Sequence, residues 1–390
     1  MKENLCKPEQ SSGRPVMKIA FVSNFLNHHQ TPVADELYRR LGDDYRFIST
    51  TETPESFLKS GYPDCRAFPY NILAYESEEK RAEAQRFVDE ADAVIIGSAP
   101  YSWVEKCVEA GKQTFIYSER WFKRVPRNYF SPGLWKSLFK YHFRWSRKPN
   151  VSVLCASAFL PKDLDLFGLY KGRRYKWGYF TECPKLDITD VISKRRRECV
   201  DIFWCARFID WKRWDLPIRL ARNLKDDGYK FHLRMAGMGD DSGKAKHLIG
   251  SQEIEDCVDL IGNLPNAEIL KKMEESSIFL FTSNRQEGWG AVLNEAMSRG
   301  CACVVGDEIG SAPYLIKDGE NGFLFKSCNL EDLTEKVRLL LDDAALRKRV
   351  SVAAYETMQG EWGSRGAVSR IISLLNKKLF ENGICGLLKK

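Results

Sequence analysis

The chain has 390 residues and a hydrophobic content of 44%, which predict a globular protein of two domains. Its net charge of +7 is modest for this length, so the distribution of the charged residues carries more information than their sum. The twelve cysteines lack the spacing of a disulfide framework or a zinc site, and we expect a cytoplasmic protein with reduced thiols, no signal peptide and no bilayer-spanning segment.

The first half of the chain carries the pattern of a parallel sheet. Residues 1–16 are polar and contain Pro and Gly, so we expect a disordered extension there. Short apolar runs bounded by turn signals then predict buried parallel strands. A charged amphipathic helix is predicted at 77–91. The predicted strands cover 18–23, 45–49, 93–97, 114–118 and 151–156.

Two histidines lie in the loop after the first predicted strand. Asn24, His28 and His29 follow this strand, and the next helix starts near Pro32, a residue that suits the first helical turn. Ligands of doubly wound sheets bind beyond the carboxyl ends of the strands. These three residues are therefore candidates for binding a substrate. The alternative is a turn with solvated imidazole rings.

The segment 120–148 has the most unusual composition in the chain. Nine of its 29 residues are Lys or Arg, nine are Phe, Tyr or Trp, and none is acidic. Lys136, Lys140 and Arg144 follow a four-residue step along one face of a predicted helix. Basic residues beside aromatic ones suit an anionic membrane surface, but a core-packed helix with a solvated basic face explains the same pattern. Nucleic acid is a weaker alternative, because no nucleic-acid-binding signature accompanies the segment.

A second set of parallel strands is predicted in the second half of the chain. The loop after its first strand contains Arg207, which offers a fork of donors, and Lys212, which offers a compact charge. Two cations in one loop at the end of a strand predict a phosphate site, and a solvated basic loop is the alternative. The predicted strands cover 201–205, 230–236, 258–262, 278–281 and 301–305.

The stretch 278–305 combines a strand, a polar loop, a helix and a second strand. Glu287 lies in the loop, and Glu295 lies about one turn inside the helix. The glycines between them let backbone amides approach a ligand, and a helix N-terminus favours a phosphate. A carboxylate on each side of such a site suits a ligand with hydroxyls at both ends, such as a nucleotide sugar. Two solvated glutamates on a surface loop are the alternative.

The order Glu287-Gly-Trp-Gly-Ala-Val-Leu-Asn-Glu295-Ala-Met-Ser-Arg-Gly resembles the Glu-x7-Glu signature of family-4 retaining glycosyltransferases. The resemblance implies the GT-B fold, an α/β fold in which two Rossmann-like doubly wound domains face each other across a cleft. It implies that Glu287 contacts the donor sugar and that Glu295 holds the ribose. It also implies that donor sugar and phosphate lie close to the backbone of Gly288, Trp289 and Gly290.

The same resemblance assigns further residues to the donor. Arg207 and Lys212 match the diphosphate clamp Gly-Arg-x4-Lys of the family, with Ala206 in place of the usual Gly. As catalytic cations they would stabilise the diphosphate as it leaves. The backbone at Gly237 would approach the nucleotide, and Asn263 is a candidate for contacting the base.

Glu119 stands where many members of the family carry a histidine that contacts the donor sugar. Its carboxylate either stabilises positive charge on the reacting sugar or forms an ordinary ion pair with Arg120. Asp163-Leu-Asp165 imitates the metal-binding Asp-x-Asp of another glycosyltransferase fold, but it lies at a helix start, where acids stabilise the helix. We therefore expect no metal and no cofactor beside the nucleotide-sugar substrate.

The predicted function is transfer of a sugar, with retention, from a nucleotide-sugar donor to a hydroxyl of a glycan or lipid-linked acceptor in polysaccharide biosynthesis. Asn24, His28 and His29 would lie on the acceptor side. The predicted domains are the extension at 1–16, the acceptor domain at 17–190, the donor domain at 191–362, and a helix at 363–390 that returns to the first domain.

The predicted partners are the donor, the acceptor and an anionic membrane surface, with no nucleic acid. The enzyme would be cytoplasmic and bound peripherally to the inner face of the cell membrane. Three rival functions stay open. They are a sugar-nucleotide epimerase of the same fold, a phosphorylase with pyridoxal phosphate on a lysine, and a non-catalytic protein that binds nucleotide sugars.

Overall fold

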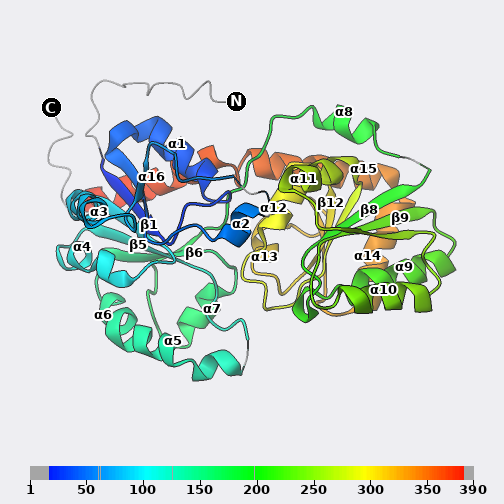
Figure 1. Ribbon diagram of the computed structural model, residues 1–390, viewed down its shortest axis with the longest axis horizontal. Helices are drawn as coiled ribbons and strands as arrows, with labels where there is room; N and C mark the ends of the chain where they lie inside the picture. Colours follow the sequence, from blue (N-terminus) through cyan, green and yellow to red (C-terminus); the bar gives the residue numbers. More distant parts are fainter. Residues whose placement is uncertain (1–16, 60, 62, 125, 197, 382–390) are drawn as a thin grey trace.

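The computed structural model describes residues 17–381 except 60, 62, 125 and 197, and it contains two parallel sheets (Figure 1). The predicted extension at 1–16 lies outside the described residues. Helices cover both faces of each sheet, so the chain forms two Rossmann-like α/β lobes joined side by side. The predicted fold class is confirmed.

The described residues of the first lobe form a seven-stranded sheet in the order β3-β2-β1-β4-β5-β6-β7. The strand order reverses between β1 and β4, which is where doubly wound sheets open a crevice. The predicted strands are confirmed apart from single-residue differences at their ends. The strands are β1 (Ile19–Ser23), β2 (Tyr45–Ser49), β3 (Asn71–Leu73), β4 (Ala93–Ile96), β5 (Gln113–Ser118), β6 (Val151–Cys155) and β7 (Arg174–Lys176).

The described residues of the second lobe form a six-stranded sheet in the order β10-β9-β8-β11-β12-β13. Its strand order reverses between β8 and β11, so the loops after these two strands lie together. The strands predicted here are also confirmed, with differences of one residue at some ends. The strands are β8 (Val200–Cys205), β9 (Phe231–Ala236), β10 (Val258–Gly262), β11 (Ile278–Phe281), β12 (Ala302–Gly306) and β13 (Phe323–Phe325).

The helices connect successive strands and cover the sheets. Those of the first lobe are α1 (Thr31–Leu41), α2 (Glu55–Lys59), α3 (Glu78–Glu90), α4 (Glu105–Glu109), α5 (Pro132–Ser137), α6 (Phe143–Trp145) and α7 (Leu160–Asp165). Those that follow in the chain are α8 (Ile188–Ser193), α9 (Asp215–Asp226), α10 (Ser242–Ser251), α11 (Asn266–Glu275), α12 (Ala291–Ser298), α13 (Ala312–Leu315), α14 (Leu330–Asp342), α15 (Ala344–Gln359) and α16 (Ser364–Glu381).

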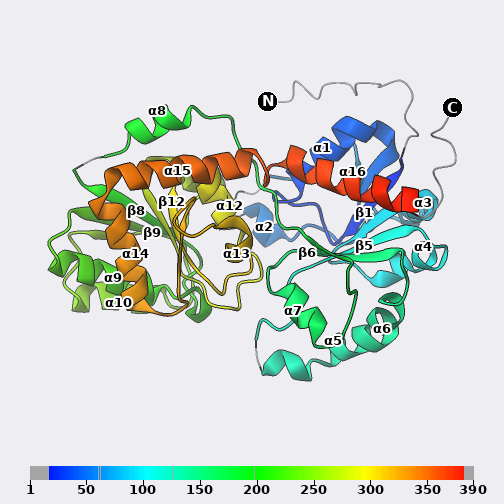
Figure 2. The same ribbon diagram turned by 180° about the vertical axis from the view of Figure 1, so that it is seen from behind.

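The last helix, α16, lies on the first lobe and packs along α1 (Figure 2). Arg40 of α1 donates hydrogen bonds to Ser369 Oγ at 3.1 Å and to the carbonyl oxygen of Arg365 at 3.2 Å. The chain therefore crosses between the lobes twice, first at 177–187 and again between α15 and α16.

The two crossings are bonded to each other. Gln359 Nε2 at the end of α15 donates to the carbonyl oxygen of Pro184 at 2.7 Å. The backbone N–H of Leu186 donates to the hydroxyl of Tyr355, also on α15, at 2.8 Å. Both connections between the lobes thus run along the same edge of the molecule.

Buried apolar side chains of both lobes form one continuous core across the boundary. Trp289 and Trp362 lie within it, with ring centroids 5.4 Å apart. Gly178 of the first crossing packs on Trp289 so closely that a Cβ at this glycine would lie 2.1 Å from the indole ring. The boundary between the lobes is therefore closely packed around these residues.

No helix of the described residues is long and apolar enough to cross a bilayer. The described cysteines are free thiols, and none of them forms a disulfide. Cys301 and Cys303 are buried, whereas Cys205 is half-buried at the end of β8 and Cys328 is exposed.

Candidate active site

A cleft of about 810 Å³ lies between the lobes. Loops that follow β1, β8, β9, β10 and β11 line it, because the carboxyl ends of the parallel strands of both sheets face it. The structure thus brings together residues far apart in the sequence. The predicted residues that line the cleft are His28, His29, Arg207, Lys212, Gly237, Asn263, Glu287, Gly290 and Glu295.

Glu287 and Lys212 form an ion pair on the wall of the cleft. Ser283 Oγ donates to the same carboxylate at 3.0 Å, and Glu287 is only 8% exposed. Thr282 fixes the lysine loop from below, since its hydroxyl donates to the carbonyl oxygen of Lys212 at 3.0 Å. The carboxylate and the ammonium are therefore held in place before any ligand binds.

Arg207 is the second cation of this wall. Its side chain is exposed, and within the described part of the chain no acidic side chain forms an ion pair with it. The guanidinium is free to accept an anionic ligand, and it lines the same cleft as Lys212. The arrangement suits a diphosphate, which both cations could contact.

Two glycines of the cleft are required by packing as well as by access for a ligand. Gly237 has a φ of 131°, and a Cβ there would lie 2.0 Å from the carbonyl oxygen of Ala206. Gly290 has a φ of 88°, and a Cβ there would lie 2.3 Å from the ring of Phe281. A side chain at either position would strain the backbone and displace the loop that it belongs to.

Glu295 of α12 faces His28 of the first lobe, with 3.7 Å between Oε1 and Nε2. Burial raises the pKa of Glu295 to about 7, and the nearby charge of Arg299 opposes this rise. Burial lowers the pKa of His28 to about 4. At neutral pH the imidazole is therefore neutral and the carboxyl group is partly protonated, so the pair can both donate and accept hydrogen bonds.

The raised pKa of Glu295 predicts a pH-dependent cost to stability. The carboxyl group goes from its ordinary pKa of 4.5 to about 7 on folding, so its contribution is favourable below pH 4.5 and is lost as the pH rises through 7. The Glu295→Gln substitution should therefore stabilise the protein at pH 8, by on the order of 3 kcal/mol, and much less at pH 5.

Thermal unfolding at the two pH values measures this effect. Glu268→Gln, an exposed acid on α11, is the matched control and should change the melting temperature little at either pH. An equal shift for Glu295→Gln at pH 5 and pH 8 would contradict the raised pKa.

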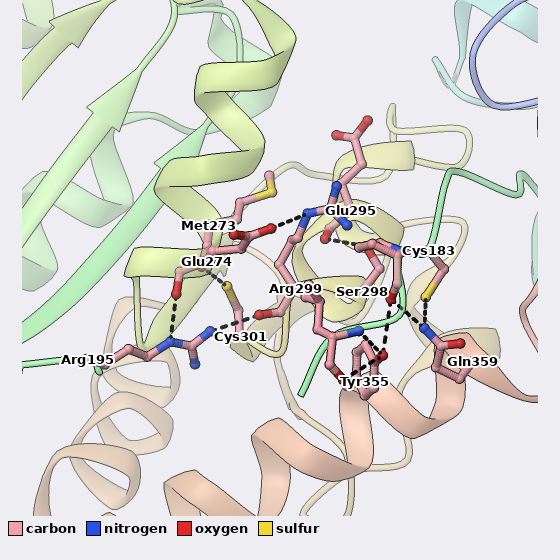
Figure 3. A network of polar contacts seen from close by, with 12 residues as sticks. Cys183, Arg195, Met273, Glu274, Glu295, Ser298, Arg299, Cys301, Tyr355 and Gln359 are labelled. Atoms are coloured by element: carbon pink, nitrogen blue, oxygen red, sulfur yellow. Dashed lines mark hydrogen bonds and ion pairs between the residues drawn. The ribbon is translucent and has the colours of Figure 1, made fainter. Parts of the chain in front are cut away.

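Arg195 holds the C-terminal ends of α11 and α12 together (Figure 3). Its guanidinium donates to the carbonyl oxygens of Glu274 at 2.9 Å, Gly300 at 2.7 Å and Arg299 at 2.8 Å. Arg195 belongs to a run of basic residues, 194–197, but it is not solvated, because it is only 8% exposed. A cation at the end of a helix stabilises it, so Arg195 fixes the helix that presents Glu295.

A second cavity of about 530 Å³ adjoins the cleft in the first lobe, and Asn24 and Glu119 line it. The two cavities share His29, Phe57 and Tyr179 among their lining residues. Asn24 therefore lies beside this second cavity, away from the wall that carries Arg207, Lys212 and Glu287. His29 stands between the two.

Glu119 is paired with Lys123, and the hydroxyl of Tyr179 donates to it at 2.6 Å. The expected alternative, an ion pair with Arg120, is wrong. The Arg120 guanidinium lies instead 3.8 Å from Asp163 and over the ring of Phe159.

Asp163 is buried, and its carboxylate accepts hydrogen bonds from the backbone N–H groups of Trp121 and Phe122. It thus fixes the chain after β5 rather than the start of its own helix. Asp165 pairs with Arg174 at 2.6 Å. Among the described residues, no cluster of three or more His, Cys, Asp or Glu side chains is arranged to hold a metal ion.

Two residues predicted to bind the donor do not line the cleft. The side chain of Trp289 is fully buried, and its Nε1 donates to Asn294 Oδ1 at 2.9 Å. The side chain belongs to the core between the lobes, so the predicted approach of the donor concerns the backbone at this position alone. A Cβ at Gly288 would lie 2.1 Å from the carboxylate of Glu119, so this glycine allows close approach of the lobes.

Tyr179 is a central residue that the sequence analysis missed. It stacks on the ring of His29, with centroids 4.0 Å apart and an interplanar angle of 8°. Asn294 Nδ2 donates to its carbonyl oxygen at 2.9 Å, which ties it to α12. Tyr179 lies in the first crossing between the lobes, and the aromatic residues around it, Trp177 and Phe180, were the signal available in the sequence.

Comparison with known proteins finds a family match in the second lobe. Residues 192–357 match the family model described as Glycosyl transferases group 1. This part of the chain is similar to the group 1 glycosyltransferases. The match includes Arg207, Lys212, Glu287 and Glu295 and excludes the second cavity.

Curated relatives of this chain include glycosyltransferases named for the biosynthesis of amylovoran and of colanic acid. The amylovoran biosynthesis glycosyltransferase AmsK of Erwinia amylovora is 29% identical over 207 residues, which are 52% of this chain and 50% of the relative. The putative colanic acid biosynthesis glycosyltransferase WcaL of Escherichia coli is 27% identical, over 45% of this chain and 46% of the relative. The chain spans half or less of the length of the curated relatives that it matches.

Solved structures of other proteins share the fold over both lobes. Anabaena HepE in complex with UDP has a TM-score of 0.66 at 15% identity, with 93% of this chain and all of HepE (100%) covered. The lipopolysaccharide outer core galactosyltransferase WaaB has a TM-score of 0.65 at 16% identity, with coverage of 93% and 100%. At this identity the likeness concerns the GT-B arrangement of the two lobes.

Proposed function

We propose that the chain transfers a glycosyl unit from a nucleotide-sugar donor to an acceptor hydroxyl, with retention of configuration at the anomeric carbon. The observation that carries the proposal is the cleft in which Arg207, Lys212, Glu287 and Glu295 meet. Two cations beside two carboxylates match the charges and hydroxyls of a nucleotide diphosphate sugar. The group 1 glycosyltransferase match over the same residues supports it.

In this function each residue has a separate task. Arg207 and Lys212 bind the diphosphate and stabilise its charge as the bond to the anomeric carbon breaks. Glu287 accepts hydrogen bonds from hydroxyls of the sugar and holds it against the acceptor. Glu295 binds a ribose hydroxyl from the base of the cleft. The acceptor oxygen bonds to the anomeric carbon as the bond to the diphosphate breaks, and the acceptor proton passes to the departing nucleoside diphosphate.

The cavity beside the cleft is proposed to bind the acceptor. His29 and Tyr179 stand between the cavity and the cleft, so an acceptor hydroxyl can reach the sugar past their stacked rings. Glu119 lies close to the donor loop, beside Gly288, and its carboxylate is available to positive charge on the reacting sugar. The relatives named for amylovoran and colanic acid biosynthesis favour a growing polysaccharide as the acceptor, and we propose that it is carried on a lipid at the inner face of the cell membrane.

Product analysis with a panel of nucleotide sugars tests the function, and UDP-sugars come first because HepE was solved with UDP. We expect transfer to a glycan acceptor, and nuclear magnetic resonance of the product should show the anomeric configuration of the donor. Activity should persist in EDTA, because Arg207 and Lys212 supply the positive charge.

Each element of the proposal has its own contrary result in this experiment. Loss of activity in EDTA, restored by manganese or magnesium, would contradict metal-independence. Inversion at the anomeric carbon would contradict retention. An epimerised nucleotide sugar without an acceptor, or binding of the nucleotide sugar without any turnover, would contradict transfer itself.

A further inference from the structure

Large apolar side chains are exposed mainly on one part of the first lobe. Among the described residues, five of the seven exposed large apolar side chains lie there, in the segment after β5 and at the end of α7. They are Tyr129, Phe130, Trp135, Phe139 and Leu166, and we call them the aromatic surface. Phe130 is 79% exposed and Phe139 is 70% exposed. Such a concentration on one face marks a contact site for an apolar partner.

The aromatic surface is held in place by ring contacts beneath it. The rings of Trp135 and Phe139 stack with centroids 6.0 Å apart, and Trp135 meets Phe167 edge-on at 5.7 Å. Tyr129 stacks on the buried Phe122 at 4.5 Å. Exposed rings anchored in this way lose little conformational freedom when a partner covers them.

The charge around the aromatic surface is positive. The segment 120–148 contains no acidic residue, and Arg124, Arg127 and Lys136 are exposed. In the described part of the chain no carboxylate forms an ion pair with these three cations. An apolar surface among such cations is complementary to an anionic lipid bilayer, in which rings enter the headgroup layer and cations meet phosphates.

Lys136, Lys140 and Arg144 were expected to lie along one face of a helix, and the structure corrects this. Arg144 is turned toward α4, where it pairs with Glu105 at 2.7 Å. The cause is the π-helical turn Leu138–His142 between α5 and α6, which breaks the four-residue step that was expected to align Lys136 with Arg144. Lys140 lies over the ring of Tyr141 at 4.9 Å. The contact surface is therefore defined by exposed rings and the cations beside them.

The aromatic surface begins at the edge of the second cavity. Trp121 and Lys123 line this cavity, and Phe122 between them stacks on Tyr129 of the surface. Arg285 of the second lobe donates to the carbonyl oxygen of Phe122 at 3.3 Å, so the same residue also lies at the boundary between the lobes. A molecule anchored in a bilayer under the surface would enter the cavity directly.

We propose that the aromatic surface docks on an anionic bilayer and that a lipid-linked acceptor enters the second cavity from that side. The second half of this inference rests on the proposed function. The docking itself follows from exposure and charge alone. In Figure 1 this surface belongs to the part of the first lobe formed by α5, α6 and α7, away from α16.

Flotation of the full chain with vesicles tests the docking. Wild type should bind vesicles of equal phosphatidylglycerol and phosphatidylcholine at least tenfold more than pure phosphatidylcholine, and high salt should weaken the binding. Phe130→Ser/Phe139→Ser and Arg127→Glu/Lys136→Glu should each lower binding to the anionic vesicles by tenfold or more. Leu339→Ser and Lys246→Glu change an exposed apolar and an exposed basic residue elsewhere, and they should bind as wild type does.

The outcomes separate this inference from the proposed function. Failure of wild type to bind anionic vesicles, or equal losses in the matched controls, would overturn the docking. Phe130→Ser/Phe139→Ser should transfer sugar to a soluble glycan acceptor at the wild-type rate, but should lose transfer to an acceptor embedded in vesicles. Equal rates on the embedded acceptor would overturn the entry route. If wild type binds the vesicles but transfers sugar to neither acceptor, the proposed function is overturned and the docking stands.

Discussion

The Lys212→Ala variant is expected to transfer sugar with a kcat/KM roughly 100- to 1,000-fold lower than wild type. Lys212 lines the cleft beside Arg207, and its ammonium is paired with Glu287. In the proposed reaction, negative charge grows on the diphosphate as the sugar leaves it, and a cation held in place stabilises that charge. Removing the ammonium also leaves a largely buried carboxylate without its partner, which repels the diphosphate.

Companion variants show whether this loss belongs to the diphosphate contact. Arg207→Ala should also lower kcat/KM strongly, and it leaves the carboxylate pair intact because Arg207 is not part of it. Lys244→Ala removes an exposed lysine outside the cleft and should keep wild-type kinetics. All three variants should unfold cooperatively. If both Lys212→Ala and Arg207→Ala keep the wild-type kcat/KM, the proposal that this loop binds the diphosphate is contradicted.

The Trp289→Ala variant is expected to lose about 3 to 5 kcal/mol of the free energy of unfolding. Trp289 is fully buried, and its ring packs near those of Tyr179 and Trp362 in the core that joins the lobes. Truncation would leave a cavity there and an unpaired amide at Asn294. Urea-induced unfolding followed by circular dichroism measures the loss.

Two further tryptophan variants calibrate the result. Trp289→Phe keeps most of the ring volume and should lose less stability than Trp289→Ala. Trp135→Ala removes an indole that is 38% exposed and should change stability much less. If Trp289→Ala keeps its stability and only the KM for the donor rises, the side chain is a donor contact and the structural role is wrong.

The strands of both sheets are predictable from the sequence because most of them are buried on both faces. A strand between two layers of helices must be apolar at successive positions, as in Ile278–Phe281, and this pattern is visible without any knowledge of distant residues. The edge strands β3, β7 and β13 have three residues each and were not predicted. Their existence depends on the neighbouring strand that they pair with.

The place of the charged residues in the cleft is predictable for a related reason, whereas the aromatic contacts of Tyr179 and Trp289 are not. Arg207 and Glu287 follow strands of one sheet, so their place at its carboxyl edge follows from the strand pattern. Tyr179 lies in a crossing without regular structure. Its role depends on stacking against His29, which is far from it in the sequence. Trp289 stands between two glycines, which suggest a ligand, but Gly178 and the core cover it.

The two crossings between the lobes have a mechanical consequence. Because they are hydrogen-bonded to each other at Pro184 and Gln359, both chain connections between the lobes lie along one edge. Rotation about this edge is the relative motion that leaves both connections intact, and it has to separate the core packing and the Arg285–Phe122 hydrogen bond that also join the lobes. Such a rotation would separate His28 from Glu295 without breaking either sheet, and it would widen the far edge first. A bound nucleotide would then be exchanged through a hinge rotation of the lobes rather than through unfolding of a loop.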